Sequence, residues 1–235
     1  MAVFVVSDIH GMYKQFEKIL SFWDQESTLV ILGDMIDRGP QSYEVVRKVM
    51  ELKDRFGERV VYCKGNHEEM LLDFMQLPEA KLSFYFPNGG RKTMRSFVNG
   101  APVSVKELNP IEQAYYVKEH FADELAFLEN GKLYEIIGNV LLTHAGFESQ
   151  FTELPESSDD DFLWMRDHYL HPNKTCYINV FGHTPTMLIH KSDEIWVSAD
   201  KKYIAIDGGC AYGGQLNALL ICDTGKIIET FSVKG

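Results

Sequence analysis

Short hydrophobic runs alternate with helical patterns over the first 63 residues. Residues 2–6 (AVFVV), 28–32 (TLVIL) and 59–63 (RVVYC) are mostly apolar and rich in β-branched side chains, which is typical of strands buried on both faces. Between them, residues 12–23 and 42–56 place their apolar side chains on one stripe at helical spacing. This order predicts an α/β fold with parallel strands, right-handed crossovers and a ligand site at the carboxyl ends of the strands.

The pattern changes in the middle of the chain. Residues 68–76 and 111–128 have helical periodicity, and turn-forming sequences stand at 87–90 (PNGG) and 99–102 (NGAP). We therefore predict a helical insert over about residues 75–130.

Strand-like runs dominate the rest of the chain, which we expect to form one domain with the first part, over residues 1–235. These runs lie at 133–137, 139–143, 178–181, 194–197, 203–206, 217–222 and 226–232. The acidic run at 159–161 predicts the cap of a helix around 160–168.

Composition and charge narrow the class of protein. The chain has 235 residues and a formal net charge of −11, so its surface is a poor general attractor for nucleic acid or anionic lipid. Four cysteines without metal-binding or disulfide spacing predict small buried thiols in a reducing compartment. The N-terminus lacks the charged and apolar regions of a signal peptide, and no apolar run could span a bilayer. We expect a cytoplasmic protein without nucleic-acid or membrane partners. The sequence does not indicate its oligomeric state.

Metal-binding residue types follow the strand-like runs in five places. The sequences are SDIHG (Asp8, His10), GDMIDRGP (Asp34, Asp37, Arg38), GNHE (Asn66, His67), THAG (His144) and FGHTP (His183). Each fragment alone is a weak signal, because a lone polar residue after a strand is usually structural. The first three are expected at one edge of one sheet, and the last two follow later strand-like runs. Five such fragments in order are rarely an accident and indicate an active site.

The same five fragments resemble the calcineurin-like metallophosphoesterases. Within that superfamily they are most similar to the phosphoprotein phosphatase branch, which includes bacterial and phage Ser/Thr protein phosphatases and diadenosine tetraphosphatases. Residues 206–219 (IDGGCAYGGQLNAL) resemble the closing motif of that branch, so only the insert is not covered. The resemblance implies a four-layer α/β/β/α sandwich with a helical insert.

The resemblance also implies a site for two divalent metal ions. One metal would be bound by Asp8, His10 and Asp34, and the other by Asp34, Asn66, His144 and His183, with Asp34 bridging. Imidazole, carboxylate and amide ligands without thiolate suit Mn²⁺, Fe or Zn²⁺, and we expect Mn²⁺. Two dications against two carboxylates leave a charge of about +2, which suits a phosphate dianion despite the acidic chain.

Catalytic roles follow from the same resemblance. A hydroxide that bridges the metals would attack phosphorus in line. His67 would protonate the leaving group, and Asp37 would orient its imidazole. Arg38 and Arg166, the latter in WMRD, would bind the phosphoryl oxygens. Tyr212 is expected either at the rim of this site or in a packed aromatic cluster.

Four histidines match none of these motifs, and we expect them at the surface: His120, His168, His171 and His190. Nucleases of the superfamily carry a GHxH sequence whose second histidine also binds metal. Pro185 stands at that position here, which disfavours a nuclease.

Three functions compete. The first is hydrolysis of phosphomonoesters, above all phosphoserine and phosphothreonine in proteins; the alternative is hydrolysis of dinucleoside polyphosphates such as diadenosine tetraphosphate. The insert and the loop at 147–161 should separate them, by building a nucleotide pocket or leaving an open groove. For the basic residues Arg91, Lys92 and Arg95, we expect one of two roles: they bind a polyphosphate, or they face solvent. A non-catalytic binding module would require a degraded site, whereas every expected ligand is present.

Overall fold

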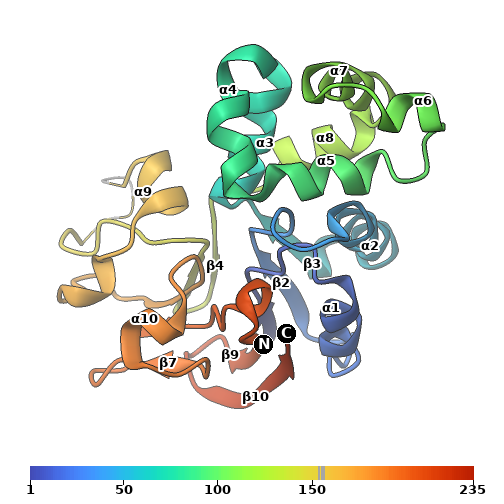
Figure 1. Cartoon of the computed structure of the whole chain (residues 1–235). Helices are drawn as coiled ribbons and strands as arrows, with labels where there is room; N and C mark the ends of the chain where they lie inside the picture. Colours follow the sequence, from blue (N-terminus) through green and yellow to red (C-terminus); the bar gives the residue numbers. More distant parts are fainter. Residues whose placement is uncertain (153, 155–156) are drawn as a thin grey trace.

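Two five-stranded sheets lie face to face at the centre of the computed structural model, which describes residues 1–152, 154 and 157–235 (Figure 1). The first sheet has the strand order β10-β9-β1-β2-β3. Its strands are β1 (Ala2–Val6), β2 (Thr28–Leu32), β3 (Val60–Cys63), β9 (Gln215–Cys222) and β10 (Ile227–Lys234). The strands β1, β2 and β3 are parallel, as the sequence predicts, whereas β9 is antiparallel to β1 and β10 is antiparallel to β9.

The second sheet has the order β4-β5-β6-β8-β7. Its strands are β4 (Tyr134–Ile137), β5 (Val140–Thr143), β6 (Ile178–Phe181), β7 (Trp196–Val197) and β8 (Tyr203–Ala205). The three central strands are parallel, and β4 and β7 are antiparallel edges. Both sheets therefore present carboxyl ends of parallel strands, the place where ligand sites form in such sheets.

Helices cover the outer face of each sheet. The crossover helices α1 (Tyr13–Leu20) and α2 (Ser42–Phe56) pack on the first sheet, and α9 (Asp159–Trp164) and α10 (Thr186–His190) lie against the second. The acidic run 159–161 begins α9: Ser158 is its cap, and Asp161 accepts a hydrogen bond from the Ser158 backbone N–H at 2.7 Å. The helix is shorter than predicted, because it ends at Trp164.

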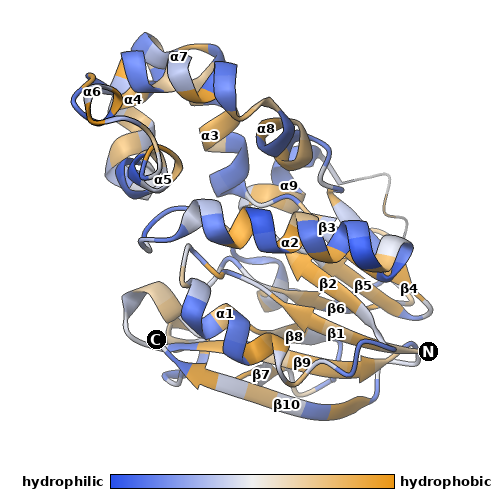
Figure 2. Cartoon of the chain, turned by 90° about the vertical axis from the view of Figure 1, so that its right-hand side faces the viewer, coloured by the Kyte–Doolittle hydropathy of each residue, from blue (hydrophilic) through white to orange (hydrophobic). Residues whose placement is uncertain are grey.

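Three hydrophobic clusters separate the layers. One fills the space between the sheets, with alternate residues such as Val3, Val5, Val30 and Leu32 pointing into it. The other two lie between each sheet and its helices. Figure 2 shows the hydrophobic strands behind the more hydrophilic helices α1 and α2. The fold is the predicted four-layer α/β/β/α sandwich.

Six α-helices and a π-turn connect β3 to β4. They are α3 (Asn66–Gln76), α4 (Pro78–Tyr85), η2 (Phe86–Gly90), α5 (Arg91–Phe97), α6 (Val103–Lys106), α7 (Pro110–His120) and α8 (Ala122–Glu129). The periodic segment 111–128 is two helices, because the backbone turns at Phe121. At the predicted turn 87–90, Gly89 has a φ of 115°, and the chain kinks there between α4 and α5. The helices α4 to α7 lie above α2 in Figure 1. The predicted bounds of the helical insert, about residues 75–130, stay a prediction.

All four cysteines are free thiols. Cys63 and Cys210 are buried as expected. Cys176 is exposed and Cys222 is half-buried, so the expectation of buried thiols is wrong for Cys176 and holds only in part for Cys222. Among the described residues, no helix has the length and apolar character needed to cross a membrane.

Candidate active site

The polar loops after the parallel strands have an unusual backbone conformation. Six of the residues singled out by the sequence have left-handed φ angles, between 48° and 69°: Asp8, His10, Asp34, Asp37, Arg38 and His183. Such conformations are uncommon outside glycine and cluster at functional sites, where the surrounding structure holds them. The loops also approach closely: a Cβ on Gly65 would lie 2.3 Å from Asp34 Oδ1.

Asp34 lies at the centre of the site, with its two carboxylate oxygens facing different histidines. Its Oδ2 is 3.4 Å from His10 Nε2, and its Oδ1 is 3.4 Å from His144 Nε2. All three side chains are buried. One carboxylate that faces two separate imidazoles is the arrangement required of a residue that bridges two metal ions.

Backbone carbonyls fix the tautomers of both histidines. His10 Nδ1 lies 2.8 Å from the carbonyl oxygen of Ile36, and His144 Nδ1 lies 2.7 Å from that of Leu32. A carbonyl only accepts hydrogen bonds, so each Nδ1 carries the proton and each Nε2 keeps a lone pair. Orientation by such a partner is typical of metal-binding histidines.

Asn66 and His183 complete one side of the site. His144 Nε2 is 3.1 Å from Asn66 Oδ1 and 3.2 Å from His183 Nδ1. Donor atoms that each lie about 2.1 Å from one cation are about 3.0–3.4 Å from one another. The spacing of these atoms, together with Asp34 Oδ1, therefore suits a shared cation.

Asp8 supplies a carboxylate oxygen that has no partner among the described residues. Its Oδ2 accepts hydrogen bonds from Ser7 Oγ at 2.5 Å and from the His183 backbone N–H at 2.9 Å. Its Oδ1 is buried without a hydrogen-bond donor and lies 3.9 Å from His10 Nε2. Burial raises the pKa of Asp8 and of Asp34 well above the usual range. A bound cation would offset this cost, so these residues fit a metal.

His67 and Asp37 form a separate buried pair beside Asp34. His67 Nδ1 is 2.6 Å from Asp37 Oδ2, and His67 Nε2 is 3.8 Å from Asp34 Oδ2. Burial raises the pKa of Asp37 to about 7, against the opposing effect of hydrogen bonds from Thr93 and Tyr85. Burial also lowers the pKa of His67 well below its usual value, and the charge of Arg38 adds to this effect. The position allows His67 either to bind metal with His10 and Asp34 or to transfer a proton.

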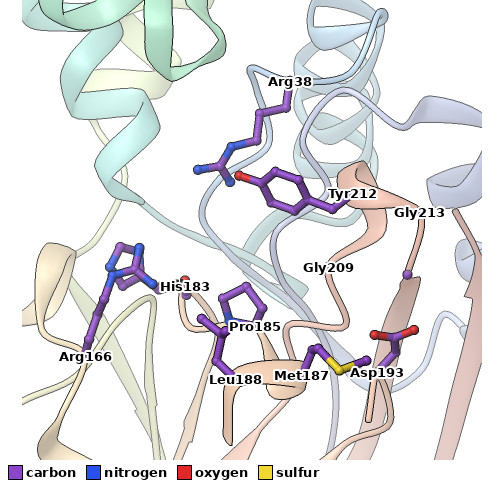
Figure 3. A pocket seen from close by; sticks show the side chains of 11 residues that line it. Arg38, Arg166, His183, Pro185, Met187, Leu188, Asp193, Gly209, Tyr212 and Gly213 are labelled. Atoms are coloured by element: carbon purple, nitrogen blue, oxygen red, sulfur yellow. Dashed lines mark hydrogen bonds between the residues drawn. The ribbon is translucent and has the colours of Figure 1, made fainter. Parts of the chain in front are cut away.

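A cavity of about 560 Å³ opens from His183, between Arg38 and Arg166. Figure 3 shows Arg38 beside the Tyr212 ring on one side, and Arg166 beside His183 on the other. The Arg38 guanidinium lies 5.1 Å from the centre of the Tyr212 ring and contacts His10 Nε2. Arg166 is tied to the site by a 2.9 Å hydrogen bond from Nη1 to the His183 carbonyl. Tyr212 is 68% exposed, so it lies at the rim.

Part of the cavity wall comes from α10, to which the sequence assigned no role. Pro185, Met187 and Leu188 of α10 and its cap line it, with the glycine-rich segment 209–214. The sequence left open whether 75–130 and 147–161 build a nucleotide pocket or leave an open groove. None of their described residues lines this cavity, so they do not build its wall. Residues 153, 155 and 156 lie outside the described residues.

Three further predictions have mixed outcomes. Arg91 and Arg95 line a different cavity, with Phe86 and Lys106, and do not reach the one beside His183. His120, His171 and His190 are not buried, as expected. The prediction for His168 is wrong: it is buried, burial lowers its pKa to about 3, and its Nε2 lies 3.0 Å from Asn179 Oδ1.

Glu68 is a site residue to which the sequence assigned no role. Its buried carboxylate accepts hydrogen bonds from the backbone N–H groups of Gly65, Asp34 and Met35 at 2.8–2.9 Å. It therefore joins the start of α3 to the loop that carries Asp34. The motif GNHE contained this signal, because a glutamate at the third position of a helix commonly caps its N-terminus.

Replacing Glu68 by alanine should destabilise the protein strongly. The change leaves three buried N–H donors without acceptors, and each unsatisfied donor costs about 1–3 kcal/mol. A loss of about 3 kcal/mol lowers the Tm of a chain of this size by about 6–12 °C. Thermal unfolding of E68A, with the exposed-residue variant Glu51→Ala as control, measures this effect. An unchanged Tm in E68A would contradict the role of Glu68.

Comparisons with known proteins identify the family of this chain. The family model of the calcineurin-like phosphoesterases matches residues 1–206. The asymmetrical bis(5'-nucleosyl)-tetraphosphatase PrpE of Geobacillus sp. (strain WCH70) is 28% identical over 266 residues, covering 99% of this chain and 94% of that protein. A solved structure described as a candidate diadenosine tetraphosphatase matches with a TM-score of 0.64 and 23% identity, covering 100% of this chain and 93% of that one.

A Ser/Thr phosphatase from Saccharomyces cerevisiae, with similarity to human phosphatase PP5, also matches the fold. Its TM-score is 0.64 at 16% identity, covering 100% of this chain and 79% of that one. At such identities the structural likeness establishes the fold alone. The family match, in contrast, extends over most of the chain and includes every strand-end motif of the site. The chain therefore belongs to the calcineurin-like phosphoesterase family and is a metal-dependent phosphatase.

Proposed function

We propose that this enzyme hydrolyses dinucleoside polyphosphates such as diadenosine tetraphosphate. The observation that carries this proposal is the cavity beside His183, where two arginines stand next to exposed aromatic and apolar side chains. Arginine forks bind phosphate, and a flat aromatic such as Tyr212 offers a stacking surface for a base. Relatives named as bis(5'-nucleosyl)-tetraphosphatases that align with nearly the whole chain support the same substrate class.

The proposed metal ligands are Asp34 and the five residues around it: Asp8, His10, Asn66, His144 and His183. Their nitrogen and oxygen donors suit Mn²⁺, which we propose as the metal at both positions. Bound there, divalent cations would polarise the phosphoryl group and supply an acidified water as nucleophile. Arg38 and Arg166 would bind the phosphoryl oxygens from opposite sides of the cavity.

Hydrolysis of phosphoserine and phosphothreonine in proteins is the second candidate, and the His67–Asp37 pair favours it. An alkoxide leaving group is strongly basic and needs a proton donor as the bond to phosphorus breaks. A nucleotide leaves as a phosphate, whose last pKa is about 6, so it departs without that help. An imidazole oriented by a carboxylate 2.6 Å away can protonate an alkoxide from Nε2 when both ring nitrogens carry a proton, a charged form that the Asp37 carboxylate stabilises.

The test compares the two substrates at one site. We would measure kcat/KM of the Mn²⁺-loaded protein for diadenosine tetraphosphate and for a phosphothreonine peptide in one buffer. A base that stacks on an aromatic side chain gains about 1–3 kcal/mol, so we expect a preference for the dinucleotide of about 5- to 150-fold. A preference for the peptide would overturn the first candidate and support the second.

The variant Tyr212→Ala makes the same test specific to the base. Its KM for the dinucleotide should rise about 5- to 150-fold, from the lost stacking energy, and much more than its KM for p-nitrophenyl phosphate. The matched control is Tyr115→Ala, which removes an exposed tyrosine of α7 that does not line the cavity. Equal losses on both substrates in Y212A would mean that Tyr212 acts only by holding Arg38.

A further inference from the structure

The carboxylate of Asp37 is held from the side opposite to His67. Its Oδ2 pairs with His67 Nδ1, whereas its Oδ1 accepts hydrogen bonds from Tyr85 Oη at 2.8 Å and from Thr93 Oγ1 at 2.5 Å. Asp37, Tyr85 and Thr93 have no exposed surface. Each carboxylate oxygen thus has its own partners, and the two hydroxyl donors leave the carboxylate one orientation.

Thr93 also fixes the backbone of this residue. The Asp37 N–H donates to Thr93 Oγ1 at 2.8 Å and to Ser42 Oγ at 3.1 Å, and these two hydroxyl oxygens are 3.0 Å apart. Asp37 has a left-handed φ of 69°, a conformation that needs such support in a residue other than glycine. One threonine therefore holds both the backbone and the side chain of Asp37.

The kink between α4 and α5 brings these two donors together. Tyr85 is the last residue of α4, and Thr93 lies in the first turn of α5. A Cβ on Gly89 would lie 2.7 Å from the backbone nitrogen of Arg38, and one on Gly90 would lie 2.4 Å from the Tyr85 ring. The helical segment thus packs directly on the loop that carries Asp37 and Arg38.

We propose that Tyr85 and Thr93 are positioning residues, which hold the Asp37 carboxylate and through it the imidazole of His67. This proposal rests on the proton-donor role of His67, which belongs to the second candidate function, the hydrolysis of phosphomonoesters. In this arrangement the segment α4–α5, which none of the metallophosphoesterase motifs includes, is part of the catalytic machinery. Neither side chain lines the cavity, so Tyr85 and Thr93 act on the site through Asp37.

The test uses Thr93→Val and Tyr85→Phe, each of which removes one hydroxyl with little change in shape. A positioned acid contributes about 10²–10⁴-fold, so partial loss of its orientation should lower kcat for phenyl phosphate about 10- to 100-fold. For p-nitrophenyl phosphate, whose leaving group is more acidic, we expect a loss of less than about threefold. KM should stay within about twofold, because neither residue touches substrate.

Two controls separate positioning from general damage. Thr93→Ser keeps the hydroxyl and should restore the kcat for phenyl phosphate. Tyr203→Phe removes another buried tyrosine hydroxyl, which donates to the His171 carbonyl outside the site, and should leave both rates unchanged. Equal losses on the two substrates, or no rescue in T93S, would overturn the positioning role.

A measurement on the metal-free protein does not depend on activity. The Nδ1 proton of His67 should give a downfield NMR signal in the histidine-labelled wild type, and this signal should shift or exchange faster in T93V and Y85F. An identical signal in all three proteins would overturn the proposal. If His67→Asn has no effect on phenyl phosphate, the proton-donor role itself fails. If His67→Asn lowers the rate on phenyl phosphate while T93V and Y85F match the wild type, only the positioning role fails.

Discussion

Replacement of Asp34 by alanine is expected to abolish paired metal binding and phosphatase activity together. The two oxygens of this carboxylate face His10 and His144 at the same distance of 3.4 Å, so Asp34 serves both sides of the site. A bound metal supplies several kcal/mol of transition-state stabilisation. Since each 1.36 kcal/mol is a factor of ten in rate, we expect kcat/KM to fall by about 10³-fold or more.

The measurement is metal content by elemental analysis after loading with Mn²⁺, alongside kcat/KM on p-nitrophenyl phosphate. The wild type should hold two ions per chain, and the Asp34→Ala protein at most one. Asp54→Ala, which removes an exposed carboxylate of α2, is the matched control and should hold two. Two ions in the D34A protein would show that Asp34 does not bridge them.

The positions of the motif residues could be predicted from the sequence because they follow from strand polarity. Parallel strands place their carboxyl ends at one edge, so residues that directly follow β1, β2 and β3 must meet there. His144 and His183 follow β5 and β6 of the second sheet in the same way. The distances among Asp34, His10 and His144 are the structural consequence of that rule.

Other parts of the site depend on contacts that no local pattern shows. Tyr85 and Thr93 lie outside every motif, and they reach Asp37 only because the chain kinks at Gly89. Part of the cavity wall comes from α10, a five-residue helix too short to give a periodic signal. His168 is buried because the second sheet and its covering loops enclose it, which depends on tertiary packing and not on its neighbours in sequence.

Replacement of His67 by asparagine tests the assignment that the geometry leaves most open. Its Nε2 lies 3.8 Å from Asp34 Oδ2, close enough to belong to a cluster of metal ligands with His10 and Asp34. Asp8, however, presents a buried carboxylate oxygen without another partner among the described residues and competes for the same position. The hydrogen bond from His67 to Asp37 is what a proton donor requires. We therefore expect H67N to keep two metal ions.

The kinetic effect of H67N should depend on the leaving group. For a phosphothreonine peptide or phenyl phosphate, kcat should fall about 10²- to 10⁴-fold, the usual contribution of a positioned acid. For diadenosine tetraphosphate the loss should be far smaller, because the departing nucleotide is a weak base that needs no proton in the transition state. Loss of one metal ion in H67N would instead make His67 a ligand. An equal fall on all substrates, with both ions retained, would show that His67 acts on the phosphoryl group and not on the leaving group.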